Sequence, residues 1–79
     1  MTYNQMINNE IKRQEKILSA NKCFPFNRNG IRLGIASLED ELQETLKAWN
    51  KEKRGIKYKE TKKELIQVIA LGIRILSQF

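Results

Sequence analysis

The sequence predicts an all-α protein, and three observations support that prediction. Apolar residues recur at steps of three and four along most of the 79 residues, which is the period of an amphipathic helix. The alternation of apolar and polar residues that marks a half-buried strand does not occur. The pattern breaks twice, near 21–30 and 51–57, and each break contains a glycine. The chain is therefore expected to form one domain over 1–79, an antiparallel helical bundle of three main helices.

The first helix is predicted from about Tyr3 to Ala20, within an N-terminal part that covers 1–30. Thr2 precedes it and has the side chain of a helix N-cap. The segment that follows, NKCFPFNRNG, is predicted to be a loop that ends in a turn before Ile31. The apolar edge of this helix is thin and consists of few residues, Ile7, Ile11 and Leu18.

The second helix is predicted over 31–50 and has the most regular pattern of the three. Its apolar residues form one narrow stripe, Ile31, Ile35, Leu38, Leu42, Leu46 and Trp49. Trp49 ends this stripe and is expected to pack in the core. Beside the stripe runs a flank of small residues, which would let another helix or a ligand come close: Gly34, Ser37 and Ala48.

The third helix is predicted over 58–79 and is apolar on two faces. One face carries Leu65, Ile66, Ile69, Ile73 and Leu76, and the opposite face carries Val68, Leu71, Ile75 and Phe79. A helix that is apolar nearly all round has to be buried nearly all round. Because two short partner helices cannot cover it, we expect oligomerisation to complete the bundle, as a homodimer or a tetramer.

Composition narrows the possible functions. Fifteen Lys and Arg against nine acidic residues give a net charge of +6, which favours partners that carry phosphate. One cysteine and no histidine exclude zinc sites of the Cys/His kind and Ser-His-Asp catalysis, so any metal must bind oxygen ligands. The sequence has no apolar run of the length that a secretory signal or a bilayer span needs, which predicts a cytoplasmic protein without a membrane partner.

Two pairs of polar side chains are spaced for a common site. Glu41 and Glu44 lie three residues apart in the second helix, and Glu64 and Gln67 lie three apart in the third, so the members of each pair are neighbours on a helix surface. If these two helices pack antiparallel, three carboxylates and one amide oxygen point into one cleft. Such hard oxygen ligands suit Mg²⁺, with Mn²⁺ as an alternative ion. The sequence therefore predicts a metal site at these four residues.

The motif residues resemble a known family. The string LEDELQE at 38–44 is followed, after nineteen intervening residues, by ELIQVIA at 64–70. This resembles the MazG-like all-α nucleoside triphosphate pyrophosphohydrolases, whose pattern is Glu-Glu-x-x-Glu and then Glu-x-x-Asp. Asp40 stands at the first Glu of that pattern and Gln67 at the final Asp. Because Gln67 keeps an oxygen donor but lacks the charge, the sequence leaves open an enzyme of reduced activity or none.

The resemblance implies a reaction and roles for residues. A nucleoside triphosphate would be hydrolysed to its monophosphate and pyrophosphate with Mg²⁺, by a dimer or tetramer of helical bundles. The catalytic carboxylates would be Glu41, Glu44 and Glu64. Cations near these acids would hold the substrate phosphates, and the candidates are Lys47, Lys51, Arg54, Lys57 and Arg74.

A different class of function fits the same composition. The stretch 47–63 holds eight cations against Glu52 and Glu60, so a small basic helical protein could bind nucleic acid without any catalysis. The apolar third helix could equally serve as a module that binds a protein partner. Unlike the pyrophosphohydrolase, neither of these alternatives requires a metal ion.

Overall fold

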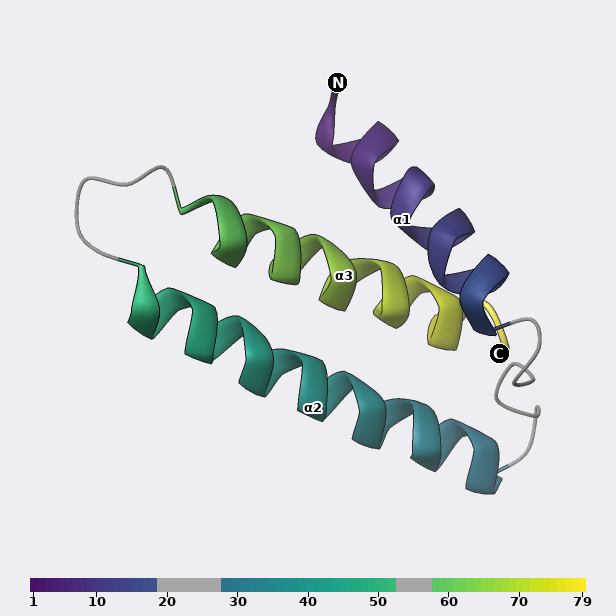
Figure 1. Cartoon of the computed structure of the whole chain (residues 1–79). Helices are drawn as coiled ribbons and strands as arrows, with labels where there is room; N and C mark the ends of the chain where they lie inside the picture. The colour runs from purple at the N-terminus through teal and green to yellow at the C-terminus, as the bar shows by residue number, and fades with distance from the viewer. Residues whose placement is uncertain (19–27, 53–57) are drawn as a thin grey trace.

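The computed structural model describes residues 1–18, 28–52 and 58–79 (Figure 1). These parts contain three helices: α1 (Tyr3–Leu18), α2 (Arg28–Lys51) and α3 (Lys59–Leu76). No strand occurs in the described residues, so the all-α prediction is confirmed. Among the helices of the described parts, none is both long and apolar enough to cross a membrane.

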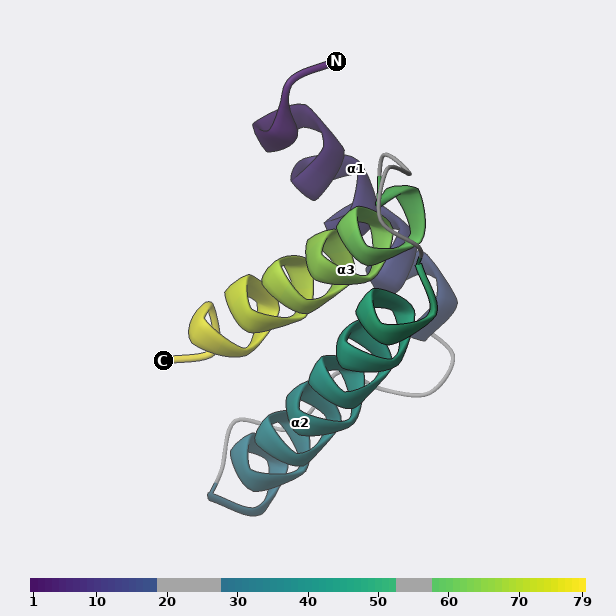
Figure 2. The ribbon, with the colours of Figure 1, turned by 90° about the vertical axis from the view of Figure 1, so that its left-hand side faces the viewer.

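The central element is α3, because both other helices pack on it. α2 lies along α3 and runs in the opposite direction (Figures 1 and 2). α1 crosses α3 obliquely, and its first half diverges from α3 toward the N-terminus. The arrangement is a helical hairpin of α2 and α3, with α1 laid across one side of α3.

α1 begins at the N-cap that the sequence predicts, whereas α2 begins before the predicted position. The Oγ1 atom of Thr2 accepts a hydrogen bond from the Gln5 backbone N–H at 3.1 Å, and Gln5 Oε1 accepts one from the Thr2 N–H at 2.8 Å. This reciprocal pair is a capping box, and it confirms Thr2 as the N-cap. The predicted turn before Ile31 is wrong, because α2 already begins at Arg28. Gly30 is buried inside that first turn, where tertiary packing outweighs its poor helix propensity.

The end of α2 fixes the start of α3. Glu52 Oε1 accepts hydrogen bonds from the Thr61 backbone N–H at 2.6 Å and from its hydroxyl at 3.0 Å, so it caps α3 from the neighbouring helix. Tyr58 precedes α3 with a left-handed φ of 50°, and its ring stacks on Trp49 with centroids 4.8 Å apart. Within one chain Trp49 is 52% exposed, so the expectation that it packs in the core is not met.

The buried core is small and belongs to α3. Its apolar members are Val68, Ala70, Leu71 and Ile75. α2 faces α3 with its flank of small residues, since Gly34 is buried and Ser37 and Ala48 are half-buried. Much of the apolar stripe of α2 therefore points outward, as does one face of α3, and the exposed large side chains there are Ile35, Leu42, Leu46, Trp49, Leu65, Ile69, Ile73 and Leu76.

Candidate functional site

The antiparallel packing of α2 and α3 brings carboxylates of both helices together. Glu41 on α2 and Glu64 on α3 are both half-buried. Burial raises the pKa of Glu41 above its ordinary value, and the charges of Glu64, Glu44 and Glu10 raise that pKa further. These four residues, which we call the carboxylate cluster, come from all three helices. Burial and these neighbouring negative charges together disfavour the ionised form of Glu41.

Glu44 lies at the outer edge of this cluster. Its Oε1 pairs with Lys47 Nζ at 3.3 Å, and more than half of each side chain is exposed. An ion pair of this kind contributes little to stability, because water screens it and two long side chains must be held in place. Glu44 is therefore held only weakly in its present orientation.

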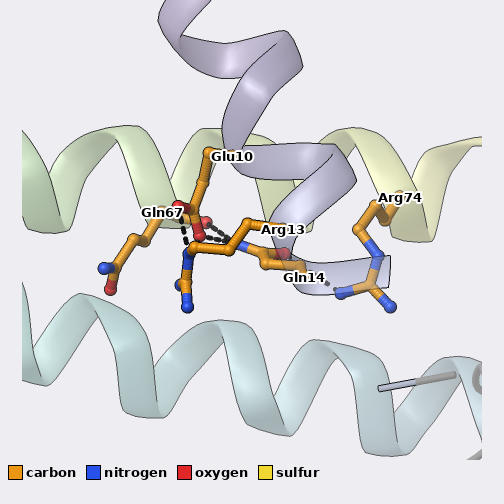
Figure 3. A network of polar contacts seen from close by, with 5 residues as sticks. All are labelled: Glu10, Arg13, Gln14, Gln67 and Arg74. Carbon is orange, nitrogen blue, oxygen red and sulfur yellow. Dashed lines mark hydrogen bonds and ion pairs between the residues drawn. The ribbon is translucent and has the colours of Figure 1, made fainter. Parts of the chain in front are cut away.

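Gln67 occupies the interface between α1 and α3. Its backbone carbonyl accepts a hydrogen bond from Gln14 Nε2 at 3.1 Å. Figure 3 shows its side-chain amide turned away from Gln14. The side chain is half-buried, as is that of Glu64 one turn earlier. The structure thus places the second predicted pair on the covered side of α3.

The donor set of the site has the chemistry that a hard divalent cation prefers. It offers three carboxylates and one amide oxygen from Glu41, Glu44, Glu64 and Gln67. Burial is the main cause of the raised pKa of Glu41, and the repulsion that adds to it is of the kind that a bound dication relieves. In the part of the chain that the structure describes, no three His, Cys, Asp or Glu side chains are already gathered around a point where a metal ion could sit.

α1 adds two functional side chains that the sequence reasoning missed. Arg13 donates hydrogen bonds to both carboxylate oxygens of Glu10, at 2.7 and 2.6 Å (Figure 3). This contact lowers the pKa of Glu10 below its ordinary value, although burial opposes the shift. The charge of Arg13 also acts on Glu41, where it opposes the rise in pKa. The spacing of three residues between Glu10 and Arg13 was visible in the sequence, but nothing there placed the pair beside Glu41.

The predicted phosphate-binding cations differ in their surroundings. Lys47 and Lys51 are exposed near the end of α2. Arg74 is only 8% exposed, and its Nη1 donates a hydrogen bond of 3.0 Å to Gln14 Oε1. Its guanidinium is thus engaged in the α1–α3 interface. Arg54 and Lys57 lie outside the described residues, as do Cys23, Phe24 and Phe26 of the predicted loop.

Comparison with known proteins adds no relative. No family model, curated protein or solved structure matches the chain. The resemblance to the MazG-like family therefore stays a prediction from the motif residues at 38–44 and 64–70.

Proposed function

We propose that this protein is a MazG-like nucleotide pyrophosphohydrolase, which hydrolyses a nucleoside triphosphate to the monophosphate and pyrophosphate. One observation supports the proposal above the others. Glu41 and Glu64 lie twenty-three positions apart on two packed helices, both are half-buried, and burial together with the charge of Glu64 raises the pKa of Glu41. Carboxylates that repel one another across two packed helices are typical of sites that bind a cation.

In this proposal Glu41, Glu44, Glu64 and Gln67 hold Mg²⁺, or Mn²⁺ in its place. The bound ion would neutralise phosphate charge and acidify water at the site. Glu44 would exchange its weak pair with Lys47 for the ion, and that exchange frees the Lys47 ammonium to contact a phosphate. Lys51 lies one turn further along α2 and would extend the cationic edge, which Arg54 and Lys57 would continue.

We assign Arg74 a positioning role in the same proposal. Its guanidinium holds the Gln14 side chain, and Gln14 in turn donates to Glu10 Oε2 at 2.9 Å. Arg74 therefore fixes the part of α1 that carries Glu10 and Arg13 beside Glu41. A change at Arg74 should alter the site through the placement of α1.

Pyrophosphate release tests the proposal. Canonical and modified nucleoside triphosphates are screened with Mg²⁺ and with Mn²⁺, beside Glu41→Gln. We expect that at least one nucleoside triphosphate is hydrolysed. Glu41→Gln should lower the rate of pyrophosphate release about a hundredfold or more, because a metal-binding carboxylate is removed. Glu39→Gln is the matched control, since Glu39 is exposed on α2 and stands outside the carboxylate cluster.

Gln67→Asp is the second arm of the same screen. It restores the carboxylate of the family pattern, so metal affinity and turnover should both rise. Calorimetric titration with Mg²⁺ measures the first and pyrophosphate release the second. If neither the wild type nor Gln67→Asp binds Mg²⁺ or releases pyrophosphate, the proposed function is wrong.

We further propose that the active form is a homo-oligomer, because one chain leaves too much surface uncovered. The chain exposes 6414 Å², whereas a folded monomer of 9.3 kDa is expected to expose about 5,000 Å². The excess of about 1,400 Å² exceeds the roughly 800 Å² per partner that a stable interface of standard size buries.

The exposed apolar residues of α2 and α3 lie on one side of the hairpin. At 100° per residue, the stripe of α2 is centred about 100° around the axis from Glu41, which faces α3. The exposed apolar residues of α3 are centred about 155° in the same sense from Leu71, which is buried. Because the two helices are antiparallel, these rotations carry both stripes to the same side of the hairpin. α1 borders this side at one end, where Tyr3 and Ile7 line a pocket with Leu65 and Ile69. A second copy can cover this continuous face with the same face of its own.

Paired leucine substitutions test the oligomer. Leu46 and Leu33 are both exposed on α2, at 54% and 59%, but only Leu46 belongs to the apolar stripe. We expect Leu46→Glu to give a monomer in sedimentation equilibrium and Leu33→Glu to leave the oligomer intact. A wild type that sediments at the monomer mass across the concentration range contradicts the proposal.

A further inference from the structure

A groove separates the first half of α1 from the first half of α3. It has a volume of about 740 Å³. The ribbon shows that α1 diverges from α3 toward the N-terminus (Figures 1 and 2). Its walls include Met6 and Arg13 from α1, and Lys62, Lys63 and Ile66 from α3. The motif residues at 38–44 do not line it, so sequence reasoning had no reason to consider it.

The charge of this groove is positive. Lys59, Lys62 and Lys63 line it from the first two turns of α3, and no ion pair ties any of them to an acid in the described residues. Arg13 and Glu10 neutralise each other in their own pair. Glu60 is then the remaining acid in the lining. The N-terminal end of α3 adds the positive pole of its helix dipole, so the groove attracts anions.

The size and the apolar wall of the groove limit the class of ligand that can bind there. About 740 Å³ falls within the range of small-molecule sites, which is roughly 300–1,000 Å³. Met6 and Ile66 give the groove an apolar side next to its cations. A ligand that combines several phosphates with a flat apolar ring fits this combination, as a nucleotide does. A continuous nucleic-acid strand would need a longer basic surface than the three lysines of this groove provide.

The groove borders the carboxylate cluster. Glu10 and Arg13 line the groove, and their charges also act on Glu41. Lys63 lines the groove and acts on Glu10. Glu10 is the member of the carboxylate cluster that lines the groove, so phosphates held by the lysines would lie beside Glu10 and Arg13.

We infer that the α1–α3 groove is the nucleotide-binding subsite, in which Lys59, Lys62 and Lys63 hold phosphates while the base packs against Met6 and Ile66. The inference rests on the proposed function for the identity of the ligand, and it selects three cations from the basic stretch 47–63. It also places the substrate on the α1 side of the hairpin, next to the apolar face that a second copy would cover, because Lys62 and Ile66 of the groove also line a pocket with Leu65 and Ile69.

Binding without metal tests the groove separately from the reaction. Inorganic triphosphate and an α,β-methylene nucleoside triphosphate are titrated into the protein in EDTA, and heat is measured. Lys62→Gln should weaken both probes about tenfold, because a charge-assisted contact to phosphate is lost. Lys12→Gln is the matched control on the exposed side of α1 and should change affinity less than about twofold. Met6→Ala should weaken the nucleotide analogue and leave inorganic triphosphate unchanged.

Three results would overturn the inference. One is an equal loss in Lys62→Gln and Lys12→Gln, which would reduce the effect to net charge. Another is tighter binding of a single-stranded oligonucleotide than of the analogue, which would favour nucleic acid as the ligand. The third is wild-type affinity in Lys62→Gln. Absence of hydrolysis with the groove binding intact would instead refute the proposed function alone, and so the two failures are distinguishable.

Discussion

Replacing Gln14 is expected to release α1 from α3. The Gln14 side-chain amide makes three contacts at this joint (Figure 3). Its Nε2 donates to Glu10 Oε2 at 2.9 Å and to the Gln67 carbonyl at 3.1 Å, and its Oε1 accepts from Arg74 at 3.0 Å. The last two contacts join residues of α1 and α3 that lie more than fifty positions apart in the sequence. The amide group therefore joins α1 to α3 through its donor and acceptor atoms alike.

The loss of stability expected in Gln14→Leu follows from these contacts. The substitution removes all three hydrogen bonds and leaves the Arg74 guanidinium, 8% exposed, without its partner. A buried charged group that loses its partner costs about 2–4 kcal/mol. A single core below 80 residues supplies only about 3–5 kcal/mol, so this one change should consume most of the free energy of unfolding.

A double-mutant cycle isolates the contribution of the contact. Arg74→Met removes the charge together with the donor and leaves only a neutral amide unsatisfied, so it should cost about 1–2 kcal/mol. The double variant with Gln14→Leu should then cost about as much as Arg74→Met alone, because no stranded charge remains. The coupling free energy between the two sites is expected to exceed about 1 kcal/mol.

Urea unfolding followed by circular dichroism measures each variant, at one fixed protomer concentration because self-association would add to the apparent stability. Gln43→Leu is the matched control, since Gln43 is exposed on α2, and it should stay within about 0.5 kcal/mol of the wild type. The reasoning is refuted if Gln14→Leu is no more destabilising than Gln43→Leu, or if the two changes in the cycle simply add.

Two carboxylates of the cluster should respond to pH with opposite signs in thermal unfolding. Arg13 lowers the pKa of Glu10 below its ordinary value of 4.5. The stabilisation that Glu10 gives to the fold is therefore present above pH 4.5 and is lost as the pH falls through the lowered pKa. Glu10→Gln should destabilise the protein at neutral pH only. The pKa of Glu41 is raised above 4.5, so stability is lost as the pH rises from 4.5 through the raised value, and Glu41→Gln should stabilise at neutral pH and not below 4.5. Equal pH profiles for the two variants would contradict this. Thr2→Ala should lower the free energy of unfolding by about 1 kcal/mol through loss of the capping box with Gln5, whereas Thr45→Ala, whose hydroxyl bonds within its own helix, should not.

Local rules were enough to predict the helices. The N-cap at Thr2 and the period of α2 and α3 depend on neighbours within four residues, and the sequence carries that information directly. The covered position of Glu64 and Gln67 was also predictable, because both share a face with the buried Leu71. The start of α2 was not, since Gly30 signals a turn until its tertiary packing is known.

The way in which α1 packs on α3 could not be predicted from the sequence, and the reason is physical. Its contacts with α3 combine an apolar edge at Ile7 with polar side chains such as Gln14 and Arg74, and a hydrophobic pattern carries no signal for the polar contacts. Arg74 looked like an exposed cation because buried arginines are rare. The same limit hid Glu10 and Arg13 as neighbours of Glu41, since their place follows from the docking alone.

The way in which α2 meets α3 links the proposed site to the proposed oligomer. If the apolar stripe of α2 had packed on α3, Glu41 would lie about 100° around the helix and face water, far from Glu64. Packing through Gly34, Ser37 and Ala48 instead brings Glu41 toward Glu64, and it leaves Leu42 and Leu46 exposed. The hydrophobic effect opposes that exposure in a lone chain, so a carboxylate cluster at this interface requires another surface to cover the stripe. Assembly of the site and self-association are therefore expected to depend on the same rotation of α2.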